Sequence, residues 1–268
     1  MRSPSAPALV ASTRAPLTDA EPTGRGPSTP ERGRLYVGTS GFAYPGWSPR
    51  FYPSGLKGDA LLHYYATRLT AVELNNTFYQ SPSASKVATW VAATPPSFRF
   101  SVKAQRGGSW RALSGEPDPG LPWLTAPYRL FGERLGTVLV RLPDNMIRSD
   151  ERLSAMLEAW PRDLPLTVEF GHPSWAADDV TAMLRRAGAV LCATDAPDDH
   201  EPPTLRRTGP FLYVRLRRHD YPVAALRAWR DRFEPFLAAG DDVYAFFRHD
   251  EAGHGAELAL RLLDESTP

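Results

Sequence analysis

The chain of 268 residues has little cysteine and no excess of charge of either sign. Its single cysteine, Cys192, excludes an internal disulfide and any metal site made only of cysteines. Because Cys192 stands in the apolar run AVLCAT, we expect it to pack in the core. Lys and Arg number 31 against 30 Asp and Glu, which argues against a general nucleic-acid binder.

Long apolar runs are absent as well. No stretch approaches the roughly 20 residues that cross a bilayer. The apolar run at residues 8–11 is shorter than the core of a signal peptide, which has about 7–15 residues. We therefore expect a cytoplasmic protein without a membrane partner.

Several motifs of catalysis and cofactor binding are missing. The sequence has no glycine-rich phosphate loop of the P-loop or dinucleotide type, no GxSxG nucleophile motif, and no HxH or HExxH spacing. We expect no cofactor. The alternative is a divalent metal, for which Glu73, Glu169, His172 and Asp195 offer suitable ligand atoms.

Residues 1–33 are rich in Pro, Ser, Thr, Ala and Arg and show no apolar periodicity. Such a segment cannot bury enough apolar area to offset the entropy lost on ordering. We predict a disordered N-terminal tail over residues 1–33, followed by one domain over residues 34–268.

Beyond the tail, strand-like and helix-like segments alternate. The expected strands cover residues 35–38, 71–75, 98–103, 137–142, 166–170, 189–194, 211–216 and 243–247. Strict alternation requires a parallel sheet, and eight units in one stretch fit a (β/α)8 barrel, whose typical length is about 250 residues. We predict an α/β protein with a TIM-type barrel. A doubly wound open sheet is the alternative, and the short connections favour closure.

Local signals set the expected helix boundaries. Asp59 caps a helix that runs to Leu69, and Ser83 begins the next one. Gly188 ends the helix that follows the fifth strand. Two long loops follow the first and third strands, and the Gly- and Pro-rich segment 105–127 is predicted to be one of them.

The segment VELNNTFYQSP, residues 72–82, places a carboxylate inside an apolar strand. Period-two alternation puts Glu73 on the side opposite Val72 and Leu74. A carboxylate in such a strand costs free energy unless it is paired or used. Glu73 is therefore either a functional group or a partner in a structural ion pair.

In barrels of this type the active site lies at the C-terminal ends of the strands. Polar residues collect at those ends in this sequence: Thr39, Ser40, Glu73, Asn75, Lys103, Arg141, Glu169, His172, Thr194, Asp195, Arg215, Arg217, Arg248 and His249. Two carboxylates facing across a pocket act as acid and base if their surroundings separate their pKa values. We predict this role for Glu73 and Glu169, with Lys103 as a third catalytic residue. Ion pairing of the carboxylates with Lys103, Arg141 and Arg215 is the alternative.

The one basic run extends from Arg206 to Arg218 and includes the seventh strand. The ends of strands seven and eight often hold phosphate in such barrels, and Arg215, Arg217 and Arg248 are able to bind it through two donors each. Alternatively, Arg217 and Arg218 are solvated or paired with Asp220 and Asp250. The aromatic residues of the two long loops either wall a pocket or pack the barrel top: Phe42, Tyr44, Trp47, Phe51, Tyr52 and Trp110.

Five motifs stand out along the chain: GTSG at residues 38–41, FYP at 51–53, VELNNTFY at 72–79, VEFGHPSW at 168–175 and YVRL at 213–216. Together they resemble the YecE-like family, domain of unknown function 72. The resemblance implies a TIM-type barrel and a distant relation to sugar isomerases. The residues that match positions typical of the family are Glu73, Asn75, Thr77, Tyr79, Lys103, Glu169, His172, Trp175, Asp195 and Arg215.

The sequence departs from the family pattern at four places. Arg141 and Asp144 stand where the family tends to have Gln and a second Pro, and Gly171 replaces an Arg. Arg217-Arg218 replace a His-Gly pair, and Arg248-His249 replace an Asn pair. Relative to the family, arginines are thus shifted from strand five to strands seven and eight.

Two functional hypotheses follow. The first is an enzyme that acts by acid–base chemistry on a small polar anionic substrate of the sugar or sugar-phosphate type. Its substrate-binding residues are Thr39, Ser40, Asn75, Tyr79, Arg141, His172, Trp175, Asp195, Arg215, Arg217 and Arg248. The second is a non-catalytic binding protein for a phosphorylated ligand or nucleic acid.

Overall fold

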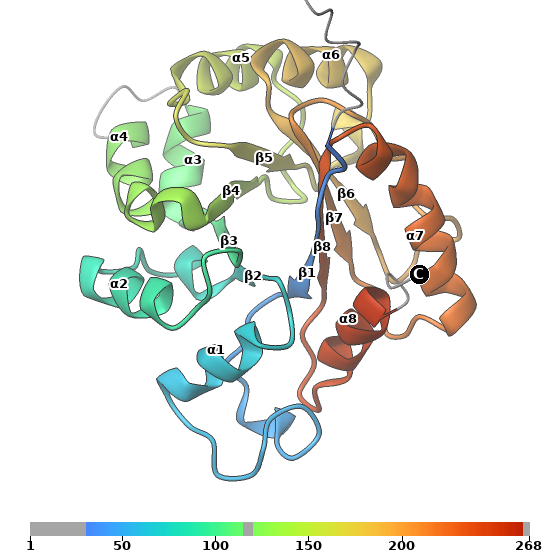
Figure 1. Cartoon of the computed structure of the whole chain (residues 1–268). Helices are drawn as coiled ribbons and strands as arrows, with labels where there is room; N and C mark the ends of the chain where they lie inside the picture. Colours follow the sequence, from blue (N-terminus) through green and yellow to red (C-terminus); the bar gives the residue numbers. More distant parts are fainter. Residues whose placement is uncertain (1–30, 115–119, 265–268) are drawn as a thin grey trace, which may run out of the picture.

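The computed structural model describes residues 31–114 and 120–264, in which eight parallel strands form a nearly closed barrel surrounded by helices (Figure 1). The strands are β1 (Leu35–Thr39), β2 (Ala71–Leu74), β3 (Arg99–Lys103), β4 (Leu135–Arg141), β5 (Leu166–Glu169), β6 (Val190–Asp195), β7 (Phe211–Leu216) and β8 (Asp242–Phe247). They pair in the order β1-β8-β7-β6-β5-β4-β3-β2, which confirms the barrel prediction. The predicted tail lies outside the described residues except at its last three positions.

The seam of the barrel lies between β1 and β2, where pairing is reduced to one bridge between Ser40 and Glu73. There the Gly41 N–H donates to the Glu73 carbonyl at 2.8 Å. Gly38 allows the two strands to approach, because a Cβ at this position would lie 1.9 Å from the Ala71 carbonyl oxygen. Closure of the barrel next to Glu73 therefore depends on a glycine.

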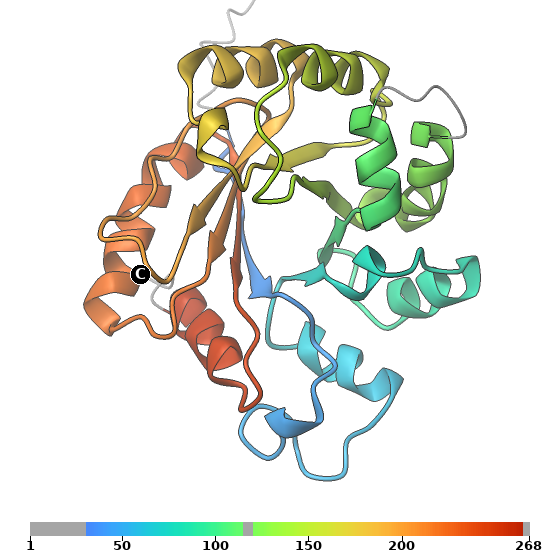
Figure 2. The ribbon, with the colours of Figure 1, turned by 180° about the vertical axis from the view of Figure 1, so that it is seen from behind.

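Helices cover the outside of the barrel in both views (Figures 1 and 2). The principal ones are α1 (Asp59–Ala66), α2 (Ala84–Ala92), α5 (Asp150–Ala159), α6 (Asp178–Ala187), α7 (Val223–Ala238) and α8 (His254–Asp264). Ser83 caps α2 by accepting from the Lys86 N–H, and Gly188 ends α6 in the left-handed conformation, as predicted. Among the described residues, no helix is long and apolar enough to cross a membrane.

Two sequence expectations were wrong. The segment expected to be one loop, residues 105–127, contains α3 (Arg106–Ser114) and α4 (Gly120–Thr125). Its glycines and prolines concealed these helices: Gly108 lets α3 pack closely on Leu124, and Pro122 lies in the first turn of α4. Helix α1 also ends at Ala66 instead of Leu69, and its N-cap is Gly58 instead of Asp59.

The core has two layers, one between strands and helices and one inside the barrel. Val72 and Leu74 belong to the outer layer, whereas Tyr213 and Cys192 lie in the inner one. Glu73, which alternates with Val72 and Leu74, therefore faces the barrel interior, and the predicted strand phase is confirmed. The buried position of Cys192 is confirmed as well.

The aromatic residues of the β1 loop mostly pack the top of the barrel. Trp47, Phe51 and Tyr52 are buried, and the Trp47 and Tyr52 rings stack with centroids 5.9 Å apart. Phe42 and Tyr44 are only partly buried. The Trp110 side chain lies outside the part of the structure that is described.

Candidate functional site at the barrel mouth

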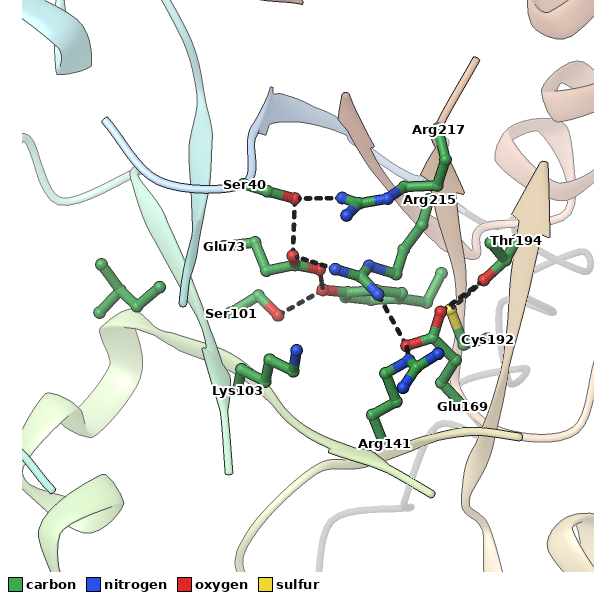
Figure 3. Close-up of polar contacts among 12 residues, drawn as sticks. Ser40, Glu73, Ser101, Lys103, Arg141, Glu169, Cys192, Thr194, Arg215 and Arg217 are labelled. Carbon is green, nitrogen blue, oxygen red and sulfur yellow. Dashed lines mark hydrogen bonds and ion pairs between the residues drawn. The ribbon is translucent and has the colours of Figure 1, made fainter. Parts of the chain in front are cut away.

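Arg215 on β7 joins two carboxylates that come from distant parts of the sequence (Figure 3). Its Nη2 atom donates to Glu73 Oε1 at 2.8 Å, and its Nη1 atom donates to Glu169 Oε2 at 2.7 Å. The exposed fractions of Arg215, Glu73 and Glu169 are 3%, 0% and 5%, so the three charges lie inside the protein. We call these three residues the Arg215 triad.

Glu73 has a complete set of hydrogen-bond donors. Ser40 Oγ donates to Oε1 at 2.7 Å and the Tyr213 hydroxyl donates to Oε2 at 2.8 Å. Ser101 Oγ lies 2.7 Å from the Tyr213 oxygen and orients that hydroxyl. Burial alone would raise the pKa of Glu73, but the positive charge of Arg215 and these hydrogen bonds lower it to about 2.

Glu169 is held in a similar way. Thr194 Oγ1 donates to its Oε1 atom at 2.7 Å, and Arg141 Nε lies 3.3 Å from its Oε2 atom. Burial would raise the pKa of Glu169, but the charges of Arg215 and Arg141, together with the hydrogen bonds from Arg215 and Thr194, lower it. Both carboxylates therefore stay ionised. Their pKa values move in the same direction, and the geometry favours the ion-paired alternative over the predicted acid–base pair.

Two cations beside the triad have no carboxylate partner in the described part of the chain. Lys103 Nζ lies 4.2 Å from the centroid of the Phe78 ring and forms no ion pair there. Burial lowers the pKa of Lys103, and the nearby charge of Arg215 lowers it further. Arg217 Nη1 donates to Ser40 Oγ at 2.8 Å, and burial also lowers the pKa of Arg217.

The side of the mouth formed by β7 and β8 adds further polar groups. Arg248 Nη1 lies 3.2 Å from His219 Nδ1, and the His249 ring stacks on Tyr44 with centroids 5.0 Å apart. Burial and the charge of Arg217 lower the pKa of His249, so its imidazole is neutral at pH 7. This region therefore presents cations beside a neutral base.

The alternative that Arg217 and Arg218 pair with Asp220 and Asp250 is wrong. Arg218 Nε donates to Asp195 Oδ1 at 2.9 Å, and the Asp195 carboxylate also accepts from Tyr221. Asp220 contacts His254, and Asp250 accepts backbone N–H groups of its own loop. Asp195 thus holds the chain segment that follows β7.

The structure gathers about half of the predicted site residues into one connected network. Its members from the prediction are Ser40, Glu73, Lys103, Arg141, Glu169, Arg215 and Arg217, and Figure 3 shows them facing one another. Lys103 belongs to it through the electric field of the triad rather than through a hydrogen bond.

The remaining predicted residues lie elsewhere or serve the framework. The Tyr79 side chain is 80% exposed, and Trp175 is buried with its Nε1–H donated to the Met146 carbonyl. His172 Nδ1 contacts Ser174, and the Thr39 N–H is already used, because it donates to the buried Tyr65 hydroxyl at 2.8 Å. The Asn75 Oδ1 atom is buried without a hydrogen-bond partner. Arg248 faces His219 on the rim, as described above.

Sequence reasoning missed Tyr213 and Ser101. Tyr213 was not selected because its neighbours in the strand are apolar. Its spacing of two from Arg215 nevertheless places both residues on the interior face of β7. Among the described residues, no group of three acidic, histidine or cysteine side chains is arranged to hold a metal ion.

The structure thus defines a parallel (β/α)8 barrel with a buried charge network at the C-terminal ends of its strands, the usual place for function in this fold. Residues 36–267 match the family model described as "Protein of unknown function DUF72", and the chain belongs to this family. The resemblance inferred from the five motifs is confirmed.

Known relatives agree with this assignment. UPF0759 protein YunF of Bacillus subtilis is 22% identical, over 86% of this chain and 94% of its own length. A DUF72 family protein of Thermotoga maritima has a TM-score of 0.75 at 27% identity, covering 87% of this chain and 98% of that one. One from Enterococcus faecalis has a TM-score of 0.70 at 19% identity, covering 86% and 94%.

Proposed function

We propose that this protein binds a small anionic compound, of the phosphate or carboxylate class, at the C-terminal mouth of the barrel. The observation that carries the proposal is the pair of cations Lys103 and Arg217. Both are partly buried beside the Arg215 triad, and neither has a carboxylate partner among the described residues. A partly desolvated cation that no carboxylate contacts directly favours an anionic ligand.

The Arg215 triad forms part of this site but does not transfer protons. Arg215 is committed to two carboxylates, and these carboxylates stay ionised because of it. We assign proton transfer, within an enzyme mechanism, to Lys103, whose pKa is lowered from its ordinary value. Glu73 and Glu169 then act as fixed counter-charges that position Arg215.

The non-catalytic alternative uses the same anion site. The pairing of both carboxylates with Arg215 favours it, because this removes the acid and base that the sequence suggested. The near-neutral charge balance of 31 to 30 still argues against nucleic acid as the ligand. Both hypotheses, the enzyme and the non-catalytic binding protein, require anion binding. Only a measurement of turnover distinguishes them.

Thermal unfolding with and without inorganic phosphate or glucose 6-phosphate tests the site. A ligand at about 100 times its Kd stabilises the folded protein by roughly 2.7 kcal/mol. We expect the rise in Tm for the wild type to disappear in Lys103→Met, while Lys57→Met, which removes an exposed lysine, keeps it. The proposal fails if no anion raises the Tm of the wild type at low ionic strength, or if Lys103→Met responds as the wild type does.

A further inference from the structure

A cavity of about 460 Å³ opens beside the proposed anion site. It lies between the segment after β2, helix α3 and the loop after β4. Most of its wall is apolar, formed by Phe78, Leu113, Pro143 and Met146. Arg106 and Arg141 are the charged residues that line it, and no described residue of the wall is acidic.

The cavity shares two residues with the barrel mouth. Arg141 lines it and also reaches Glu169 Oε2 at 3.3 Å, and Figure 3 shows its side chain pointing toward that carboxylate. Phe78 lines the cavity, and the Lys103 ammonium lies over its ring, 4.2 Å from the centroid. Arg141 Nη2 also donates to Asp144 Oδ1 at 2.7 Å, so Lys103 is the cation at this junction that no described carboxylate contacts. Phe78, Leu113, Pro143 and Met146 form most of the cavity wall.

Two exposed large side chains follow lining residues in the chain. Met146 lines the cavity, and its neighbour Ile147 is 69% exposed. Phe78 is likewise followed by Tyr79, whose side chain is 80% exposed. Ile147 and Tyr79 are not among the described residues that line the cavity, so they serve as exposed neighbours against which the lining residues can be compared.

We propose that the ligand of this site is an organic anion with an apolar body of about the size of one ring, such as an aryl phosphate or aryl carboxylate. This rests on the proposed anion-binding function and narrows its ligand class. The anionic group is held by Lys103 and Arg141, and the body enters the cavity against Phe78, Leu113 and Met146. A volume of 460 Å³ falls in the range of about 300–1,000 Å³ that small-molecule sites occupy.

The same wall disfavours a sugar phosphate. The Ser109 hydroxyl, the neutral polar side chain of the lining, is already bonded to the Gln105 carbonyl at 3.0 Å. Sugar hydroxyl groups that entered the cavity would lose water without gaining equivalent hydrogen bonds. An apolar ring gains from the same desolvation.

Isothermal titration calorimetry with phenyl phosphate, inorganic phosphate and glucose 6-phosphate tests the inference. Burial of one ring predicts that phenyl phosphate binds about 10- to 100-fold more tightly than inorganic phosphate. Glucose 6-phosphate is expected to bind no more tightly than inorganic phosphate.

Met146→Gln keeps the size of the side chain but places an amide in the apolar wall, and Ile147→Gln makes the same kind of change on the exposed neighbour. We expect Met146→Gln to lose most of the advantage of phenyl phosphate while its affinity for inorganic phosphate is unchanged. Ile147→Gln is expected to match the wild type. The thermal midpoints of both variants report whether they are folded.

The outcomes separate the two proposals. If inorganic phosphate binds and phenyl phosphate binds no more tightly, the inference on ligand class is overturned while the anion site stands. An advantage of phenyl phosphate that persists undiminished in Met146→Gln overturns the placement in this cavity. If none of the three anions binds, the proposed function fails first, and the inference with it.

Discussion

Replacing Glu73 with Gln removes one carboxylate of the Arg215 triad without changing the size of the side chain. In the wild type this carboxylate accepts from Ser40, Tyr213 and Arg215. The neutral amide offers one acceptor oxygen and turns a donor group toward the other donors. We expect Glu73→Gln to be clearly destabilised.

Two lines of reasoning give a similar magnitude for the loss of stability in Glu73→Gln. The pKa of Glu73 falls from 4.5 to about 2 in the folded protein, a shift of about 2.5, and at 1.36 kcal/mol per unit this corresponds to roughly 3 kcal/mol. Loss of one partner from a buried ion pair typically costs about 3–5 kcal/mol. Because Arg215 keeps Glu169, the lower end of that range applies, and we expect a loss of about 3 kcal/mol at pH 7.

The same shift predicts how the loss depends on pH. The folded-state pKa is depressed, so the stabilisation is complete above the unfolded value of 4.5 and is lost as the pH falls toward 2. At about pH 3.5 roughly 1 kcal/mol of it has disappeared. The difference between wild type and Glu73→Gln therefore becomes smaller on acidification.

Urea unfolding at pH 7 and at about pH 3.5 measures both effects, with Glu158→Gln, an exposed carboxylate on α5, as the control. Surface changes of this kind stay within about 0.5 kcal/mol. A midpoint for Glu73→Gln equal to or above that of the wild type at pH 7 would refute the reasoning. It would mean that Glu73 faces solvent instead of Arg215.

Three further predictions concern the framework of the site. Tyr213→Phe leaves Glu73 Oε2 without its donor and is expected to cost about 1–3 kcal/mol in urea unfolding; a neutral effect would contradict the hydrogen bond. Gly38→Ala forces the β1–β2 seam apart and is expected to cost at least about 1–3 kcal/mol; an unchanged Tm would show that the seam tolerates a Cβ. Deletion of residues 1–30 is expected to leave the Tm unchanged, because the composition of that segment predicts no packing, and a fall of several degrees would contradict this.

The barrel architecture and the inward or outward orientation of the strand residues could be predicted from the sequence alone. Alternation of strand and helix patterns requires a parallel sheet, and the length of the chain favours closure into a barrel. The period of two in residues 71–75 placed Glu73 opposite Val72 and Leu74, which the two core layers confirm. These properties are local, so they can be read from short stretches of residues. Helices α3 and α4 were not predicted from the sequence. Gly108 is needed for close packing and Pro122 is tolerated by its position in the helix, and composition reveals neither.

Only the tertiary structure decided which charges meet. Glu73 and Arg215 are 142 positions apart in the chain, and closure of the barrel brings β2, β5 and β7 together around one guanidinium. Strand periodicity says that a side chain points inward but gives neither its partner nor its distance. Those distances decide whether Glu73 is a proton donor or a fixed counter-charge. Burial raises its pKa, but the charges of Arg215 and Arg217 and the hydrogen bonds from Ser40 and Tyr213 together lower it to about 2.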